Sequence, residues 1–220
     1  MIEKVKIKNS SRYAISTEES FELDSNNSVL KNYLGIKSTD EMEALEEQEL
    51  ERTELELLKI FDEKHQFTAE DICNIHELWL GDVYSFAGKY RTVNMAKGDF
   101  LFAPSARITD LMEILEKDFL AKYTPCNYTD AEKLAEALGV VHVELILIHP
   151  FREGNGRTAR LLADLMAIQA KKSPLNYSAI DQIENKRGFE KYIMAIHAGL
   201  SGNYEPIKNI FKSLLEQSIP

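Results

Sequence analysis

The sequence predicts a mainly α-helical protein that carries one β-hairpin. Two observations lead to this fold class. Apolar residues recur at helical spacing in most segments after residue 38. β-branched and aromatic residues instead gather around a Lys97-Gly98-Asp99 turn, which is typical of two short strands joined by a tight loop. No internal repeat or low-complexity tract interrupts the pattern.

The first segment, residues 1–37, lacks a helical period and is expected to form an irregular N-terminal arm. Turn-forming residues cluster at 9–11 and 24–28, and a short strand is expected at 5–7. The remainder, residues 38–220, is expected to form one helical domain.

The helical domain is expected to begin at Ser38, Thr39 or Asp40, because each of these side chains suits a helix N-cap. Glutamates are frequent between residues 41 and 56. Because no histidine and no ordered aspartate pattern accompanies them, they indicate a solvated helix face rather than a metal site.

A second helix is expected to start at Thr68, where Thr68-Ala-Glu-Asp71 is similar to a capping box. The hairpin follows at about residues 90–104 and ends at Pro104. Periodicity then predicts five more helices, over residues 106–122, 130–148, 155–171, 180–199 and 204–217.

Composition limits the possible partners. Apolar residues make up 44% of the 220 residues, enough for a real core, and the formal net charge is −10. An acidic chain is repelled by phosphate backbones and anionic membranes, so neither a nucleic acid nor a membrane is expected as a partner. Cys73 and Cys126 lack the spacing of a disulfide framework or a zinc site. The chain shows no signal peptide, and its most apolar run, residues 140–148, is too short to cross a bilayer. A cytoplasmic protein is expected.

The segment between residues 149 and 160 carries the chemistry. Pro150 disfavours the helical region for His149, so the preceding helix is expected to stop there. Gly154 and Gly156 then allow the backbone to curl tightly, and a helical pattern resumes at once.

A glycine-lined loop that leads into a helix N-terminus is an anion site, since free amides and the helix dipole both face the ligand. Arg157 and Arg160 are three residues apart and are expected to share one helix face, where two guanidinium groups suit a polyphosphate. Glu153 suits a Mg²⁺ ion that bridges phosphates, and His149 suits a proton acceptor near neutral pH. Phe151 is expected to anchor the loop in the core.

Each of these features alone is common and often without function, but here they occur within twelve residues. The pattern His149-x-Phe151-x-Glu153-Gly154-Asn155-Gly156-Arg157-x-x-Arg160 resembles the signature of Fic-domain proteins at every fixed position. The stretches 86–94, 97–104 and 29–35 are similar to the flap region and to the entry segment of filamentation-type, toxin-like members.

The resemblance implies a helical bundle with a hairpin flap and the transfer of AMP from ATP-Mg to a Ser, Thr or Tyr hydroxyl of a target protein. It implies that His149 is the base and Glu153 the magnesium ligand. It also implies that the loop and the flap hold ATP, with the Asn155 side chain near the α-phosphate; the implied ATP-binding residues are Lys97, Gly98, Gly154, Asn155, Gly156, Arg157 and Arg160.

Relatives called Doc phosphorylate their targets and carry Lys where this chain has Gly156, so AMP transfer is favoured over phosphorylation. Three alternatives stay open: a catalytically silent nucleotide-binding or interaction module, transfer of another group such as UMP or phosphocholine, and removal of AMP. The resemblance leaves the target unidentified; a subunit of a type II topoisomerase is suggested by analogy alone.

Many Fic proteins are inhibited by a Ser/Thr-x-x-x-Glu-Gly/Asn helix whose Glu pairs with the second arginine of the signature. Near matches end at Glu43, Glu113 and Glu205, and none has Gly or Asn next. A separate, small antitoxin-like protein that places a Glu against Arg160 is therefore the expected inhibitor. The other histidines, His65, His76, His142 and His197, lack metal-ligand spacing, although His142 is positioned to brace the site.

Overall fold

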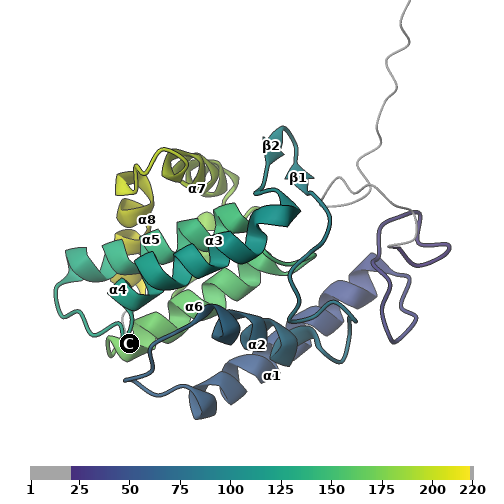
Figure 1. The fold of residues 1–220 in the computed structure, drawn as a ribbon, viewed down its shortest axis with the longest axis horizontal. Coiled ribbons are helices and arrows are strands. Elements are labelled where there is room, and N and C mark those ends of the chain that lie inside the picture. Colours follow the sequence, from purple (N-terminus) through teal and green to yellow (C-terminus); the bar gives the residue numbers. More distant parts are fainter. Residues whose placement is uncertain (1–20, 219–220) are drawn as a thin grey trace, which may run out of the picture.

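The computed structural model describes residues 21–218 (Figure 1). The strand expected at 5–7 lies outside the described residues. Between residues 21 and 37 the chain is irregular, as expected, with turns and one isolated bridge between Phe21 and Leu30. Val29 of this segment is only 3% exposed and packs in a cluster with Trp79 of the helical region, so residues 21–37 are part of the folded unit.

The helices expected from periodicity are present. Two helices precede the hairpin, α1 (Thr39–Ile60) and α2 (Ala69–Leu80). Ser38 caps α1, and Thr68 and Asp71 form the expected capping box at the start of α2. The later elements are η2 (Ser105–Arg107), α3 (Ile108–Ile114), the π-helical segment η3 (Leu115–Leu120), α4 (Ala121–Tyr123), α5 (Ala131–Ile148), α6 (Asn155–Gln169), η4 (Tyr177–Ile180), α7 (Lys186–Gly199) and α8 (Glu205–Gln217).

The core forms around α5, whose buried side chains contact α6, α7 and α8 (Figure 1). Gly139 allows α5 to approach α8 closely, since a Cβ there would lie 3.3 Å from the Ile207 backbone. The pair α1 and α2 packs beside α6 and buries a second, smaller cluster that includes Trp79 and Leu80. No described helix is long and apolar enough to cross a membrane.

The hairpin is much shorter than expected. Its strands are β1 (Ala96–Lys97) and β2 (Phe100–Leu101), joined through Gly98, which has a φ of 61°. The segment before β1 is not paired as a strand because Arg91 is bound to the core instead: its N–H donates to Pro150 O at 2.8 Å. In Figure 1 the hairpin projects on the side of α7, away from α1 and α2.

The helix expected at 180–199 begins later, at Lys186. Asp181 accepts hydrogen bonds from the Ile183 and Glu184 amides, which closes a turn, and Asn185 caps the helix through the Gly188 amide. Such side chain–backbone bonds compete with helix formation, and the competition explains the missing first turn.

Candidate active site at the end of α5

The end of α5 places His149 in a strained backbone conformation. The helix stops at Ile148, as Pro150 predicts, and His149 adopts φ 52° and ψ 60°, a left-handed conformation that costs energy for a non-glycine residue. Arg91 holds this turn. Its buried guanidinium donates to His149 O at 2.7 Å, Ala103 O at 2.6 Å and Val93 O at 2.6 Å, so it ties the end of α5 to the segments on both sides of the hairpin.

The imidazole of His149 is 4% exposed and lies flat against Phe102, with ring centroids 3.6 Å apart. Its Nδ1 lies 3.3 Å from Ile146 O. A carbonyl can only accept, so Nδ1 carries the proton and Nε2 is the basic nitrogen. Burial, together with the charges of Arg91 and Lys97, lowers the pKa of His149 to about 3. The ring is therefore neutral at pH 7, as a general base must be.

The loop after His149 ends in a helix N-terminus with open amides. Gly154, with a φ of 77°, is the N-cap of α6 and offers no side chain, and the first helical bond runs from Thr158 N to Gly154 O. The amides of residues 155–157 therefore have no acceptor within the helix, and they face an incoming ligand together with the positive end of the helix dipole.

Asn155 shapes this loop from inside. Its side-chain oxygen accepts from Phe151 N and its amide donates to Phe151 O, both at 2.8 Å, and the residue is 1% exposed. Each polar atom of the side chain keeps capacity for one further hydrogen bond, and its position near the α-phosphate stays a prediction. Phe151 is fully buried, as expected, and anchors the loop.

His76 supports the loop from α2, a role that the sequence did not reveal. Gly88 N donates to its Nδ1 at 2.9 Å, so its Nε2 carries the proton and donates to Glu153 O at 3.0 Å. Its ring stacks on Phe151 at 3.9 Å. Burial lowers its pKa to about 4, which keeps the ring neutral and both bonds intact at pH 7. The sequence could not predict this contact, because residues 76 and 153 lie far apart in the chain.

The two arginines of the loop contact different elements. Arg157 lies over the Trp79 ring at 4.5 Å, with Nη2 2.7 Å from Glu46 and 3.5 Å from Glu153. Arg160 lies over the Tyr177 ring at 4.9 Å. The spacing of three residues puts both on neighbouring positions of α6, but it does not bring their guanidinium groups to a common partner in this conformation.

Glu46 corrects the interpretation of the acidic helix α1. Most of its glutamates are exposed, as expected, but Glu46 is only 3% exposed. The sequence pattern could not single out Glu46 among these glutamates, because apolar periodicity identifies a buried position only when an apolar side chain occupies it.

The remaining predicted residues lie around the same loop. Glu153 accepts from Gly154 N at 2.9 Å. Within residues 21–218 no group of three acidic, His or Cys side chains is arranged to hold a metal, so Mg²⁺ would need phosphate oxygens and water besides this carboxylate. Lys97, on β1, lies 5.6 Å from the Phe189 ring of α7, and its charge reaches His149.

His142 braces α6 from the core, as the sequence suggested. Its Nδ1 lies 3.3 Å from Ala159 O, and its Nε2 lies 2.8 Å from the Tyr192 hydroxyl of α7. The bond links the first turns of α6 to α7. Burial lowers its pKa to about 3.

These buried rings predict an acid-sensitive fold. Folding lowers the pKa values of His76, His142 and His149 from 6.5 to about 4, 3 and 3. Below pH 6.5 the unfolded chain therefore binds more protons than the folded protein, and the free energy of unfolding decreases as the pH is lowered. Each ring contributes a loss of about 2 kcal/mol between pH 7 and 5. Burial raises the pKa of Asp164 to about 7. Between pH 7 and 5 this group therefore binds a proton in the folded protein but not in the unfolded chain, which offsets the loss from about one histidine.

Urea unfolding at pH 7 and pH 5 should therefore show a net loss of about 4 kcal/mol. The Asp164→Asn variant removes the opposing contribution and should lose more. Equal stabilities at the two pH values would contradict the buried, neutral state of the histidines.

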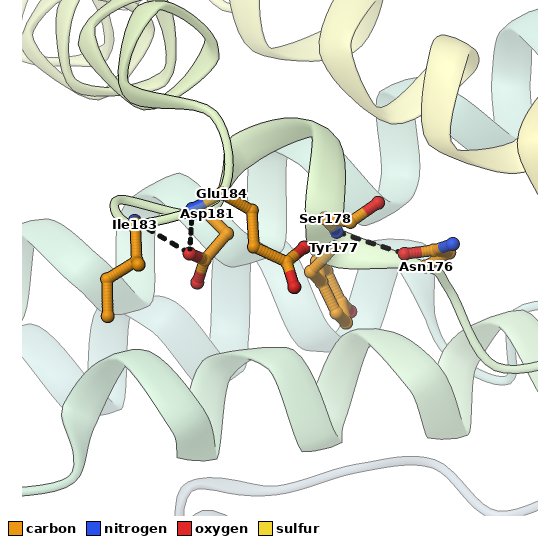
Figure 2. A pocket seen from close by; sticks show the side chains of 6 residues that line it. All are labelled: Asn176, Tyr177, Ser178, Asp181, Ile183 and Glu184. Carbon is orange, nitrogen blue, oxygen red and sulfur yellow. Dashed lines mark hydrogen bonds between the residues drawn. The ribbon is translucent and has the colours of Figure 1, made fainter.

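A hollow of about 430 Å³ lies after α6, apart from the loop (Figure 2). Figure 2 shows Asp181 accepting from the two amides of its own turn beside it. None of the predicted site residues lines the hollow; its lining residues are Asn176, Tyr177, Ser178, Asp181, Ile183 and Glu184. Arg160 packs against one of these lining residues, Tyr177.

Comparison with known proteins identifies related sequences and folds. Residues 66–167 match the model of the Fic/DOC family. The chain is 33% identical over 144 residues to the protein adenylyltransferase VbhT of Bartonella schoenbuchensis and 30% identical over 159 residues to protein adenylyltransferase fic-1 of Caenorhabditis briggsae. These alignments cover 62% and 71% of the chain but only 28% and 29% of the relatives.

Solved structures show the same fold. The N-terminal Fic domain of a cell filamentation protein from Bartonella quintana superimposes with a TM-score of 0.70 at 24% identity, covering 90% of this chain and 91% of that one. The BepC protein of Bartonella tribocorum, solved with AMPPNP bound, gives a TM-score of 0.65 at 22% identity over 84% of this chain and 91% of that one.

Proposed function

Because residues 66–167 form a domain of the Fic/DOC family, we propose that the protein transfers AMP from ATP to a hydroxyl group of a target protein. The observation that carries the proposal is the position of a neutral, Nδ1-protonated His149 beside the open amides at the start of α6. The adenylyltransferase names of VbhT and fic-1 and the AMPPNP bound to BepC support it.

In the proposed reaction, Nε2 of His149 accepts the proton of the target hydroxyl. The oxygen attacks the α-phosphorus, a new P–O bond forms, and the P–O bond to the β-phosphate breaks, so pyrophosphate leaves with its electron pair. The amides of residues 155–157 stabilise the charge on the phosphates without reorganising, because the Asn155 side chain and His76 already fix the loop. Arg157 and Arg160 neutralise the remaining charge in the proposal.

Mg²⁺, held by Glu153 together with phosphate oxygens and water, would supply further charge neutralisation at the leaving group. In the proposal Lys97 and Gly98 cover the nucleotide from the hairpin. Nε2 of His149 is buried in this structure, so the target hydroxyl reaches the base only after neighbouring side chains move aside.

The proposed partners are the same as those expected from the sequence. The target is a protein, with a topoisomerase subunit as the candidate by analogy, and a small antitoxin-like protein acts on Arg160. ATP is a cytoplasmic metabolite, so the proposed reaction belongs in the cytoplasm.

Parallel reactions with ATP labelled at the α- or the γ-phosphate test the chemistry. With Mg²⁺ and a cell lysate, we expect a protein band that carries the α-label and never the γ-label. A band with the γ-label alone would mean phosphorylation instead. Binding of ATP without label transfer, even after partners are removed under denaturing conditions and the protein refolded, would favour the silent module.

A further inference from the structure

We propose that Glu46, on α1, is a positioning residue that holds Arg157 at the nucleotide loop. The inference rests on the proposed function, since it assumes that Arg157 contacts ATP. Glu46 lies 103 residues before His149 in the sequence, on a helix that comes before the hairpin in the chain.

The first step is that Glu46 is itself fixed. The Tyr84 hydroxyl donates to its Oε1 at 2.6 Å, a short bond typical of a charged acceptor. Trp79 Nε1 donates to its backbone oxygen at 2.9 Å. Burial and the neighbouring Glu46 carboxylate raise the pKa of Tyr84, so its hydroxyl stays a donor. Glu46 is therefore held at its backbone by Trp79 and at its carboxylate by Tyr84, which gives the carboxylate a defined position from which to act on a third group.

The third group is Arg157. Its Nη2 lies 2.7 Å from Glu46 Oε2, while its guanidinium carbon lies 4.5 Å from the centre of the Trp79 ring. The Glu46 contact is an ion pair without the alignment of a hydrogen bond, so it attracts the guanidinium without using its donors fully. A guanidinium has five N–H donors, and this leaves Arg157 able to bind a phosphate while it stays paired.

Glu153 is the second acidic neighbour of Arg157, and its position explains why the pairing with Glu46 matters for the site. Glu153, the proposed magnesium ligand, lies 3.5 Å from the same Nη2, farther than Glu46. If Glu46 lost its charge, Glu153 would become the nearest counter-ion of Arg157. The arginine would then compete with a cation for that carboxylate. Glu46 therefore keeps Arg157 available for phosphate and Glu153 available for the metal.

The test measures ATP binding by calorimetry, with and without Mg²⁺, in wild-type protein, in Glu46→Gln and in Glu47→Gln. Glu47 is exposed on the same helix and serves as the matched control. We expect Glu46→Gln to bind ATP-Mg about tenfold more weakly and to need a higher Mg²⁺ concentration for half-maximal affinity, while Glu47→Gln behaves as wild type.

A purely structural role would lower the melting temperature without changing the dependence of ATP affinity on Mg²⁺. If Glu46→Gln does not fold, Tyr84→Phe keeps the carboxylate and removes its brace; we expect it to shift the Mg²⁺ dependence in the same direction by a smaller factor. Equal ATP affinity and Mg²⁺ dependence in the folded variants would overturn the inference. Tighter ATP binding in Glu46→Gln would also overturn it, because Glu46 would then restrain Arg157. Absence of ATP binding by the wild type would instead refute the proposed function.

Discussion

Replacing Gly154 by Ala should destabilise the protein by about 2–5 kcal/mol and abolish ATP binding. Two costs add. Gly154 has a φ of 77°, which an L side chain rarely adopts. A Cβ at this position would also lie 2.6 Å from Cζ3 of Trp79, a buried ring that cannot move without disturbing its bond to Glu46 O. The loop must therefore shift, and its amides shift with it.

Two other glycines separate these costs. Gly35 has a φ of 67° and open space around its Cα, so Gly35→Ala should cost only about 1–2 kcal/mol. Gly156 has neither the unusual φ nor a close neighbour, and Gly156→Ala should not lower stability. Urea unfolding of the three variants measures the difference. If Gly154→Ala unfolds like Gly35→Ala and binds ATP normally, the tight contact between the loop and Trp79 is not required.

Replacing His149 by Ala should lower AMP transfer by about 10²–10⁴-fold, the usual contribution of a general base. ATP affinity should change little, because the anion site is built from the amides and cations that follow the histidine. His65→Ala is a matched control: His65 pairs with Asp71 at the start of α2, and its carbonyl oxygen accepts from Gln169 at the end of α6 away from the loop. Transfer rates and ATP affinities of both variants, measured on the same target, check the prediction.

Local features of the site could be predicted from the sequence because they follow from chain neighbours. Pro150 stops α5, Gly154 allows the left-handed turn, and α6 resumes directly after it. The helices themselves follow from apolar periodicity, since each buries one face against α5 or against its neighbours. The family signature lies entirely within such a local stretch.

What the sequence could not predict depends on contacts between distant segments. His76 and Arg91 join the loop to α2 and to the hairpin through hydrogen bonds to carbonyl groups, which every residue possesses and no pattern reveals. Glu46 differs from its exposed neighbours only by the face on which it lies. The hairpin strands are short because Arg91 binds the core, a tertiary contact that overrides the β propensity of residues 90–95.

The divergence of Arg157 and Arg160 has the same origin. Their spacing places them on adjacent positions of α6, but the partners of each side chain come from different parts of the chain, Trp79 and Glu46 for the first and Tyr177 for the second. The spacing along the helix fixes the Cα positions of the two arginines, but contacts with the surrounding elements fix the positions of their guanidinium groups.

In the proposed mechanism His149 acts on the target hydroxyl while the loop after it holds ATP. One paired measurement tests both halves: ATP affinity and the rate of transfer of α-phosphate label, in the wild type and in His149→Ala. The variant should bind ATP with nearly unchanged affinity and transfer label about 10²–10⁴-fold more slowly than the wild type. Label transfer at the wild-type rate by the variant would contradict the assignment of the base and, with it, the mechanism.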